Sequence, residues 1–217
     1  IIGICAGLGV FKGIIDSAPT ITLEDATPTR YSSFIYDSKG NQMAKLIAED
    51  SNRVPVTMDQ IPTDLANAFV AIEDERFYQH NGIDIMGILR AGVTAVKTGF
   101  KRQEGASTIT QQLIKNLTGN DDVTVRRKVL EIFCALQFEE QYTKEEVMEW
   151  YLNTIFLGEG CAGVRSAGRV YFGKDVSDLT TAECASLISI TNNPSLYDPY
   201  INMERNRERQ LIVLSEM

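Results

Sequence analysis

Residues 107–116 read Ser107-Thr108-Ile109-Thr110-Gln111-Gln112-Leu113-Ile114-Lys115-Asn116 and come directly after Glu104-Gly105-Ala106. The run combines several hydrogen-bonding side chains with a single lysine, which is unusual for an ordinary core helix. A polar run with one cation suits an extended, oxygen-rich, anionic ligand, such as a sugar joined to a phosphate. The alternative is a polar loop that leads into a solvated helix, and the run by itself leaves both interpretations open.

The composition places the chain among ordinary globular proteins. Its 217 residues suffice for one well-packed domain, or for a domain with a small appendage. Hydrophobic residues make up 44% of the chain and charged residues 23%, which is close to the usual composition. The formal net charge of -8 argues against a general nucleic-acid binder, because such proteins are normally basic.

The charge is distributed unevenly along the chain. Between Arg90 and Lys128, eight Lys/Arg oppose three acidic residues, so this window carries +5 and the remainder -13. A basic segment in an acidic protein indicates one local anionic ligand, because a concentrated positive field attracts it. Chance clustering on a solvated face is the alternative. The basic residues are Arg90, Lys97, Lys101, Arg102, Lys115, Arg126, Arg127 and Lys128.

The four cysteines lack the spacing of a metal site. Cys5, Cys134, Cys161 and Cys184 form no CxxC or CxxH pair, which argues against zinc binding. Cys134 and Cys184 fall in apolar helical patterns, so we expect them to be small buried hydrophobic residues. The sequence leaves open whether any two of the four are bridged.

The first residues indicate a membrane segment. The stretch from Ile1 to Phe11 is uncharged but too short to span a bilayer, which takes about 20 apolar residues. We therefore expect residues 1–18 to be the end of a transmembrane helix or signal anchor whose first part lies outside this sequence. A signal-peptide remnant is the alternative. Either interpretation places the remainder of the chain outside the cytoplasm.

The rest of the chain is expected to be mainly helical. Residues 19–57 predict a linker and a β hairpin around the turn residues 37–41. Residues 58–217 predict a helical domain, since the strand–helix alternation of a doubly wound α/β fold is absent. Pro194 and Pro199 are expected to break the chain before the last helix. Apolar periodicity and capping signals predict helices near residues 62–72, 85–98, 124–136, 143–152, 163–171, 180–191 and 204–217.

The segment from Glu73 to Gly82 is a candidate for acid–base chemistry. It follows an apolar helix, contains His80, the only histidine of the chain, and ends in a glycine suited to terminating a helix. A carboxylate beside aromatic residues at the edge of a core is a candidate general base. The alternative is an ordinary charged helix end with a structural histidine.

Two further segments carry charged residues at helical spacing. Arg127 and Glu131 lie four residues apart, and an exposed pair of this kind contributes only about 0.3–0.5 kcal/mol. The segment from Lys144 to Asn153 predicts an amphipathic helix with polar ends. Taken singly, each segment is also compatible with a plain core helix that has a solvated face.

Together and in this order, the four segments resemble the signature blocks of the peptidoglycan glycosyltransferases (family 51 glycosyltransferases), the transglycosylase domain of class A penicillin-binding proteins. Residues 73–82 match Glu-Asp-x-x-Phe-x-x-His-x-Gly, and residues 105–116 match Gly-x-Ser-Thr-Ile-Thr-Gln-Gln-Leu-x-Lys-Asn in full. Residues 127–131 match Arg-Lys-x-x-Glu, and residues 144–153 match a Lys-initiated helix that ends in Tyr-Leu-Asn. The resemblance covers about residues 29–217. One departure is Cys161-Ala162-Gly163, where relatives usually carry Tyr-Gly-Ile or similar.

The resemblance implies a mainly α fold, a lysozyme-like two-lobed helical domain with a small N-terminal β hairpin. It also implies an enzyme that polymerises lipid II, a disaccharide-peptide on undecaprenyl pyrophosphate, into β-1,4 glycan strands. Glu73 would be the general base that takes the proton of the acceptor 4-hydroxyl, and the anomeric carbon of the donor would be inverted. Glu131 would be the second catalytic carboxylate, which orients nearby cations or helps the phosphate to depart.

The same resemblance assigns the basic residues to the leaving group. Preorganised cations stabilise the negative charge that develops on a departing pyrophosphate. Lys115, Arg127 and Lys128 are the first candidates for this role, followed by Arg90. The other substrate-binding residues that the resemblance implies are Asp74, Phe77, His80, Ser107, Thr108, Gln111, Gln112, Asn116 and Asn153.

The expected partners are lipid II, the nascent glycan strand and the bacterial cytoplasmic membrane, with other cell-wall synthesis proteins as further candidates. The catalytic domain would lie on the extracytoplasmic face, behind a single-pass anchor. A divalent cation, Mg²⁺ or Mn²⁺, would suit the pyrophosphate, although the sequence shows no dedicated metal cluster. Residues 83–100 are rich in apolar side chains, and in this family the corresponding region enters the membrane surface. Simple core packing is the alternative for these residues.

Two other functions stay open on the sequence. A lysozyme-like hydrolase or lytic transglycosylase would share the helical lobes and the catalytic glutamate, but cleavage of a neutral glycan has no need of Lys115, Arg127 and Lys128. A catalytically silent, membrane-anchored cell-wall scaffold is the second. Lys97-Thr98-Gly99 is similar to a transpeptidase motif but has no Ser-x-x-Lys or Ser-x-Asn companion. We therefore expect either a fragment of a longer bifunctional protein or a monofunctional enzyme.

Overall fold

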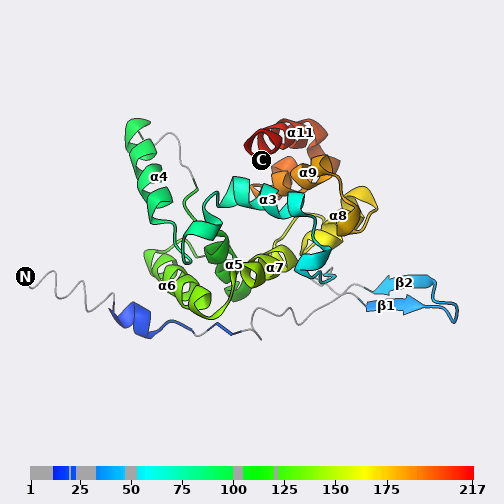
Figure 1. Ribbon diagram of the computed structural model, residues 1–217, viewed down its shortest axis with the longest axis horizontal. Coiled ribbons are helices and arrows are strands. Elements are labelled where there is room, and N and C mark those ends of the chain that lie inside the picture. The colour runs from blue at the N-terminus through cyan, green and yellow to red at the C-terminus, as the bar shows by residue number, and fades with distance from the viewer. Residues whose placement is uncertain (1–11, 20, 23–32, 47–52, 100–104, 120–121) are drawn as a thin grey trace, which may run out of the picture. The chain divides into compact units, whose positions relative to one another are not determined.

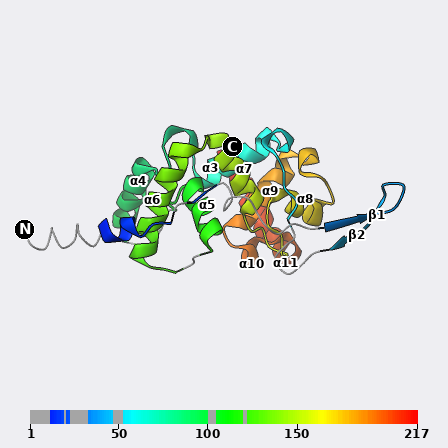
Figure 2. The ribbon, with the colours of Figure 1, turned by 90° about the horizontal axis from the view of Figure 1, so that it is seen from below.

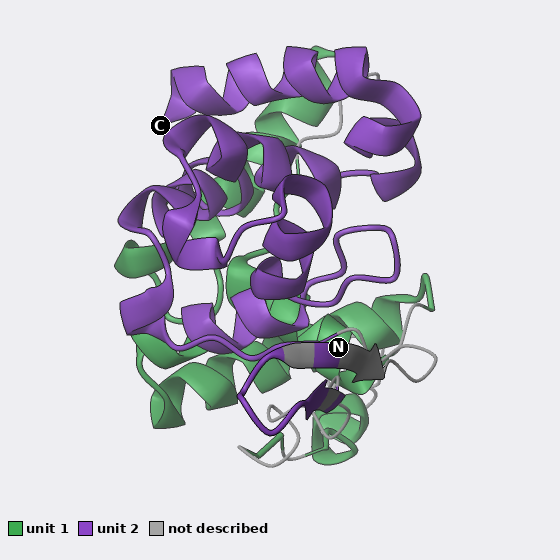
Figure 3. Ribbon diagram, turned by 90° about the vertical axis from the view of Figure 1, so that its right-hand side faces the viewer, with its two compact units in different colours: residues 1–26, 76–147 green, residues 27–75, 148–217 purple. Residues whose placement is uncertain are grey.

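The computed structural model describes residues 12–19, 21–22, 33–46, 53–99, 105–119 and 122–217. Within these residues the protein is mainly helical and contains one two-stranded sheet (Figure 1). The chain divides into two compact units, residues 1–26 with 76–147 and residues 27–75 with 148–217 (Figure 3). The predicted class, a mainly α, two-lobed domain with a small N-terminal β hairpin, is confirmed. Residues 1–11 of the predicted anchor lie outside the described residues.

The hairpin has the predicted position and turn. Strands β1 (Ser33–Tyr36) and β2 (Gln42–Leu46) pair antiparallel. The Asp37 side chain accepts hydrogen bonds from the backbone N–H groups of Lys39 and Asn41, both at 2.8 Å. Gly40 has a φ of 83°, which a turn of this kind requires and glycine tolerates.

The first unit is built around two packed helices, α5 and α6, which lie side by side (Figure 2). Ile109, Leu113 and Ile114 of α5 are fully or almost fully buried, as are Ala135 and Phe138 of α6. The run at residues 107–116 therefore leads into a buried helix, and the interpretation as a solvated loop is wrong. The elements of this unit are η2 (Phe77–Gln79), α4 (Ile85–Lys97), α5 (Ile109–Thr118), α6 (Val125–Gln141) and the first turn of α7 (Lys144–Thr154).

The second unit packs α9 against α3 and α11. Its core includes Phe69 of α3, whose ring meets Tyr151 edge to face with 5.7 Å between ring centres. Such an aromatic pair contributes about 0.5–1.5 kcal/mol beyond the burial of its area. The other elements of this unit are η1 (Met58–Gln60), α3 (Thr63–Glu73), the remainder of α7, α8 (Val164–Phe172), η3 (Val176–Asp178), α9 (Thr181–Thr191), α10 (Pro194–Tyr197) and α11 (Pro199–Glu216).

The predicted helix starts agree with the structure where a side-chain cap signals them. The Thr124 hydroxyl accepts from the N–H of Arg127 at 3.1 Å, and Thr143 and Glu146 form the predicted capping box. The two prolines interrupt the helical chain as expected, since α9 ends at Thr191 and Asp198 is extended between α10 and α11. Pro194 and Pro199 each occupy the first turn of a helix, α10 and α11, because the fixed φ of proline suits this position and no intrahelical N–H is needed there.

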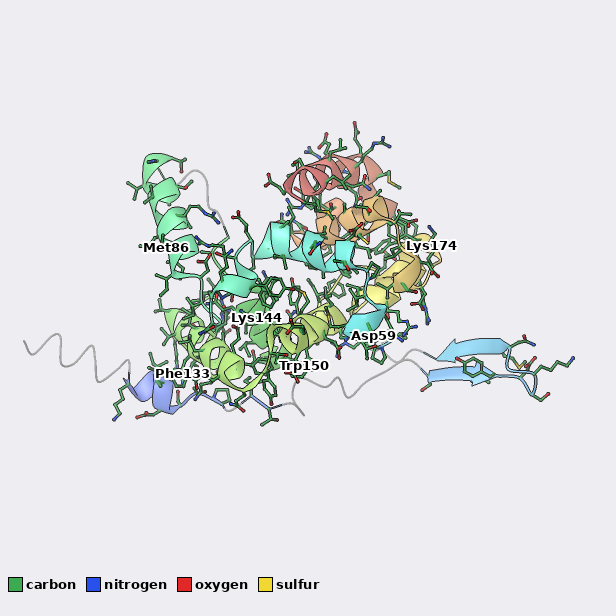
Figure 4. The ribbon with its side chains drawn as sticks, in the orientation of Figure 1. Asp59, Met86, Phe133, Lys144, Trp150 and Lys174 are labelled. Carbon is green, nitrogen blue, oxygen red and sulfur yellow. The ribbon has the colours of Figure 1, made fainter. Side chains whose placement is uncertain are left out.

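Helix α4 exposes an apolar face. Ile85, Met86, Leu89, Val93 and Val96 are between 52% and 71% exposed, and Met86 is labelled in Figure 4. Simple core packing is therefore wrong for this helix, whereas Phe100 lies outside the described residues. In the part of the chain that the structure describes, every helix is either too short or too polar to cross a membrane.

Candidate active site

Three charged side chains of α6 form a compact cluster. The Glu131 carboxylate contacts both cations, Oε2 with Arg127 Nη1 and Oε1 with Lys128 Nζ. Its side chain is only 5% exposed, against 21% for Arg127 and 37% for Lys128. A buried carboxylate that contacts two cations holds both of them in place. With two cations and one carboxylate, the cluster keeps one net positive charge that it can offer to an anion.

Lys128 also ties this cluster to the polar run. Its Nζ donates to Ser107 Oγ at 2.8 Å and to Gln111 Oε1 at 3.1 Å. With Glu131, the ammonium group thus has contacts on both packed helices, α5 and α6. A cation fixed in this way needs no reorganisation when negative charge develops beside it.

Thr108 fixes the start of α5. Its hydroxyl accepts from the N–H of Gln111 at 3.2 Å and donates to the Gly82 carbonyl at 2.7 Å. The Gln111 side chain completes the capping box by accepting a hydrogen bond from the N–H of Thr108 at 3.3 Å. Both residues are 1% exposed, so these polar side chains act on any ligand mainly through the groups that they position. The amide nitrogen of Gln111 has no hydrogen-bond partner among the described residues.

A cavity of about 190 Å³ lies beside the cluster. Lys115, Arg127 and Glu131 line it together with apolar groups. Burial raises the pKa of the Cys134 thiol, which keeps this lining residue neutral. A cavity with cations on one part and apolar groups on another suits an anion attached to an apolar chain. The remaining lining residues are Pro19, Ile114, Thr118, Leu130 and Cys134.

The loop that carries Phe77 is anchored from the interior of its unit. Phe77 is fully buried, and Lys144 Nζ, at the start of α7 (Figure 4), lies 4.3 Å from the centre of its ring. Lys144 also pairs with Glu139 at 2.6 Å, and the Thr110 hydroxyl donates to the same carboxylate. The Glu139 side chain is 3% exposed. This network joins η2, α5, α6 and α7, and Phe77 contributes to the site by packing.

His80 lines a second cavity of the same unit, with a volume of about 580 Å³. Arg76 and Asp84 also line it and form an ion pair at 2.5 Å. Asp84 caps α4 by accepting from the N–H of Gly87 at 2.9 Å. Burial by itself would raise the pKa of Asp84, but the hydrogen bonds from Arg76 and Gly87 and the Arg76 charge lower it below its usual value.

The other predicted catalytic carboxylate, Glu73, belongs to the second unit. It is the last residue of α3, is half-buried, and accepts a hydrogen bond at 2.8 Å from the hydroxyl of Thr191, the last residue of α9. Asp74 ends the helix and is 7% exposed. Burial and, after it, the carboxylates of Glu73 and Asp74 hold the pKa of Tyr151 well above its usual value, so this phenol stays neutral.

Asn153 is held by the backbone of its own unit. Its amide oxygen accepts from the N–H of Val56 at 2.8 Å, and its nitrogen donates to the carbonyls of Val56 at 2.7 Å and Glu149 at 2.9 Å. The side chain therefore fastens the segment before η1 to α7. We interpret it as a support residue, with its role toward substrate still a prediction.

The structure thus brings six of the predicted residues into one hydrogen-bonded arrangement. They are Ser107, Thr108, Gln111, Arg127, Lys128 and Glu131, and Lys115 meets them at the cavity. Arg90 lies exposed on α4, and Gln112 and Asn116 lie half-buried and exposed on α5. Glu73, Asp74 and Asn153 belong to the other unit.

Comparison with known proteins identifies the chain. The family described as Transglycosylase matches residues 39–217. The chain belongs to the transglycosylase family. The family predicted from the four polar blocks is thereby confirmed, and with it the class of enzyme, a glycosyltransferase.

The transglycosylase chain has close curated relatives. Penicillin-binding protein 1A of Escherichia coli (strain K12) is 41% identical over 210 residues, which are 96% of this chain and 24% of the relative. Penicillin-binding protein 1A of Streptococcus oralis is 40% identical over 220 residues, or 100% of this chain and 34% of the relative. The chain spans about a quarter to a third of the length of these relatives. A crystal structure of penicillin-binding protein 1A from Haemophilus influenzae matches with a TM-score of 0.42 and 21% identity, over 88% of this chain and 18% of that chain.

Two contacts near the candidate residues, one in each unit, were not predicted from the sequence. They are the Thr191 hydroxyl on Glu73 and the carboxylate of Glu139 between Thr110 and Lys144. Neither pair shows a local sequence signal, since the partners come from different elements. Among the described residues, no group of three or more His, Cys, Asp or Glu side chains is arranged to hold a metal ion. The divalent cation stays a prediction, and none of the described residues is assigned to it.

Proposed function

We propose that this transglycosylase polymerises lipid II into β-1,4 glycan strands and releases undecaprenyl pyrophosphate. The observation that carries the proposal is the cluster of Arg127, Lys128 and Glu131, with Lys115 at the adjoining cavity. Cleavage of a neutral glycan develops no charge that would need such cations, whereas departure of a pyrophosphate does. The names of the relatives, penicillin-binding proteins, support a substrate from the cell wall.

In the proposed reaction, Glu73 takes the proton of the 4-hydroxyl of the acceptor N-acetylglucosamine. The oxygen attacks the anomeric carbon of the donor N-acetylmuramic acid and inverts it. The bond from this carbon to the phosphate oxygen breaks, and its electron pair leaves with the lipid pyrophosphate. Lys115, Arg127 and Lys128 stabilise the negative charge on this leaving group, and Glu131 holds two of these cations in position.

The other predicted ligands fit around this reaction. Ser107 and Gln111 hold Lys128 from the start of α5, and we assign both to substrate binding through the position of this cation. Thr108, Gln112 and Asn116 lie on the same helix start or helix. His80, Arg90, Asp74 and Phe77 are assigned to substrate binding or to its support by the resemblance. The nascent strand and other cell-wall synthesis proteins are the proposed partners.

The first test is the reaction itself. We expect the purified protein to convert lipid II into polymer and to leave preformed glycan uncleaved. Glu73→Gln should lower the turnover number by about 10²–10⁴-fold, the usual effect of losing a general base. The exposed neighbour Glu75 offers a matched control, because Glu75→Gln changes the same charge by the same chemistry and should keep turnover. Cleavage of preformed glycan would favour the hydrolase, and a wild-type protein that neither forms polymer nor cleaves glycan would favour the catalytically silent scaffold.

We also propose that α4 lies against the cytoplasmic membrane, behind the predicted anchor. Its exposed apolar side chains, Ile85, Leu89 and Val93 among them, recur at the spacing of one helical face. A lipid-linked substrate would be reached most directly from this surface. Co-sedimentation with phosphatidylglycerol vesicles tests the proposal. Replacement of Ile85, Leu89 and Val93 by serine should weaken binding, whereas unchanged binding of this variant contradicts it.

A further inference from the structure

One hydroxyl group sits directly on the proposed general base. Thr191 Oγ1 lies 2.8 Å from Glu73 Oε1 and 2.8 Å from the carbonyl oxygen of Ile188. A threonine hydroxyl has a single proton, so it donates to only one of these two oxygens at a time. The backbone carbonyl and the carboxylate therefore compete for it.

The charge of the carboxylate decides this competition. A hydrogen bond to an ionised acceptor is about twice as strong as one between neutral groups. The hydroxyl of Thr191 therefore donates to Glu73 while Glu73 is ionised, which is the form that can take a proton. After Glu73 has accepted a proton, the carboxylic acid is the weaker acceptor, and the hydroxyl turns to Ile188. Thr191 thus contacts the form of Glu73 that reacts, and its own hydroxyl keeps its proton throughout.

The backbone around this contact is well supported. Glu73 ends α3 and Thr191 ends α9, and the two helices pack against each other within one unit. Residues 184–190 of α9 are buried, as are Leu65 and Phe69 of α3. The Thr191 hydroxyl is therefore held at a fixed place relative to the end of α3. A hydrogen bond from such a rigid point restricts the rotamers of a glutamate.

We propose that Thr191 is a positioning residue for the transglycosylase reaction, which holds Oε1 of ionised Glu73 so that Oε2 receives the proton of the acceptor hydroxyl. The inference rests on the proposed function, in which Glu73 is the general base. It predicts that the hydroxyl of Thr191 raises kcat and contributes little to the binding of lipid II. The structural alternative is that Thr191 merely ends α9 through its bond to Ile188.

Near-isosteric substitutions separate these roles. We expect Thr191→Val to lower kcat for lipid II polymerisation about tenfold, the effect of losing one hydrogen bond to a charged group, with KM changed less than about twofold. Thr191→Ser keeps the hydroxyl and should recover most of the lost kcat. Thr154 is a matched control, since it ends α7 and its hydroxyl bonds the carbonyls of Trp150 and Tyr151. Thr154→Val should keep the wild-type kcat.

The outcomes are distinguishable from a failure of the proposed function. Wild-type kcat in Thr191→Val overturns the inference, and so does a loss that Thr191→Ser fails to recover. An equal loss of kcat in Thr154→Val overturns it as well, because the effect would then belong to any helix-end threonine. Wild-type turnover in Glu73→Gln, measured in parallel, would instead overturn the proposed function together with the inference. If Glu73→Gln loses kcat and Thr191→Val does not, the positioning role of Thr191 is excluded and the proposed function stands.

Discussion

The Thr108 hydroxyl donates a 2.7 Å hydrogen bond to the carbonyl oxygen of Gly82, and this bond joins the loop of the first polar block to the helix of the second. Gly82 has a φ of 80°, and a Cβ at this position would lie 2.6 Å from the carbonyl oxygen of Ala135 on α6. The glycine at the end of the first block is thus required by a close approach of two backbones.

Gly82→Ala should therefore destabilise the protein. The substitution combines left-handed backbone strain with a clash against a main-chain atom, and we expect a loss of about 2–4 kcal/mol and a lower Tm. Gly92→Ala on α4 is the control, because the space around Gly92 is open and its φ is not positive. Alanine favours a helix interior, so this control should keep or raise Tm. Equal Tm values for the two variants would contradict the explanation for Gly82.

How much could be predicted from sequence depends on how far apart the interacting residues lie. The caps at Thr124 and Thr143 were predictable because each involves a residue three positions away. Each of the four blocks is likewise continuous in sequence. Their resemblance to the family's signature therefore predicted the family and the candidate residues that form the cluster on α6. The contact of Thr191 with Glu73 joins residues 118 positions apart, and it depends on how α9 packs on α3.

The same distinction explains why one alternative stayed open on the sequence. The run at residues 107–116 was compatible with a solvated loop because its polar side chains give no sign of their partners. In the structure, Thr108 and Gln111 are buried by capping each other and by contacts to Gly82 and Lys128, which are far away in sequence. The breaks at Pro194 and Pro199 could be predicted, because proline interrupts a preceding helix and its fixed φ suits the first turn of the next one.

Glu131→Gln should have opposite effects on anion binding and on turnover. The change keeps the shape of the side chain but removes the buried charge between Arg127 and Lys128, so the cluster gains one net positive charge. We expect inorganic pyrophosphate to bind about three- to tenfold more tightly at low ionic strength, a gain on the order of 1 kcal/mol. Turnover of lipid II should fall about 10²-fold, because the two cations lose the group that fixes them.

Isothermal titration with inorganic pyrophosphate and a polymerisation assay check both parts of this prediction. Lys128→Met is the companion variant, since it removes a cation and should weaken pyrophosphate binding. The gain in Glu131→Gln should shrink at high salt because partly exposed charges are screened. Weaker pyrophosphate binding in Glu131→Gln would show that Glu131 serves to shape the site more than to balance its charge.

Glu139→Gln should destabilise the first unit. The Glu139 carboxylate is almost fully buried and pairs with Lys144, whose side chain is 18% exposed, while Thr110 donates to it from α5. Removing one partner of a buried ion pair costs about 3–5 kcal/mol, and the partial exposure of Lys144 places the expected loss at the lower end. Glu140 is exposed and offers the matched control, because Glu140→Gln should change stability by less than about 0.5 kcal/mol. Urea unfolding of both variants provides the comparison, and similar midpoints would contradict a structural role for Glu139.

The Arg76–Asp84 pair should make stability depend on pH. The pKa of Asp84 lies below its usual value in the folded protein, because the hydrogen bonds and charge of Arg76 and the N–H of Gly87 outweigh its burial. A carboxyl group of this kind stabilises the folded state above its unfolded pKa of about 3.9, and this stabilisation is lost as the pH falls through the lower folded value. Asp84→Asn should therefore cost about 1–2 kcal/mol near pH 7, and the difference from wild type should disappear in acid.

Asn still caps a helix, so Asp84→Ala should lose about 1 kcal/mol more at every pH through the missing cap on Gly87. Unfolding curves of the three proteins across pH separate the contribution of the Asp84 charge from that of the helix cap. If the difference in free energy of unfolding between wild type and Asp84→Asn stays constant into acid, the charge of Asp84 contributes nothing through its pair with Arg76.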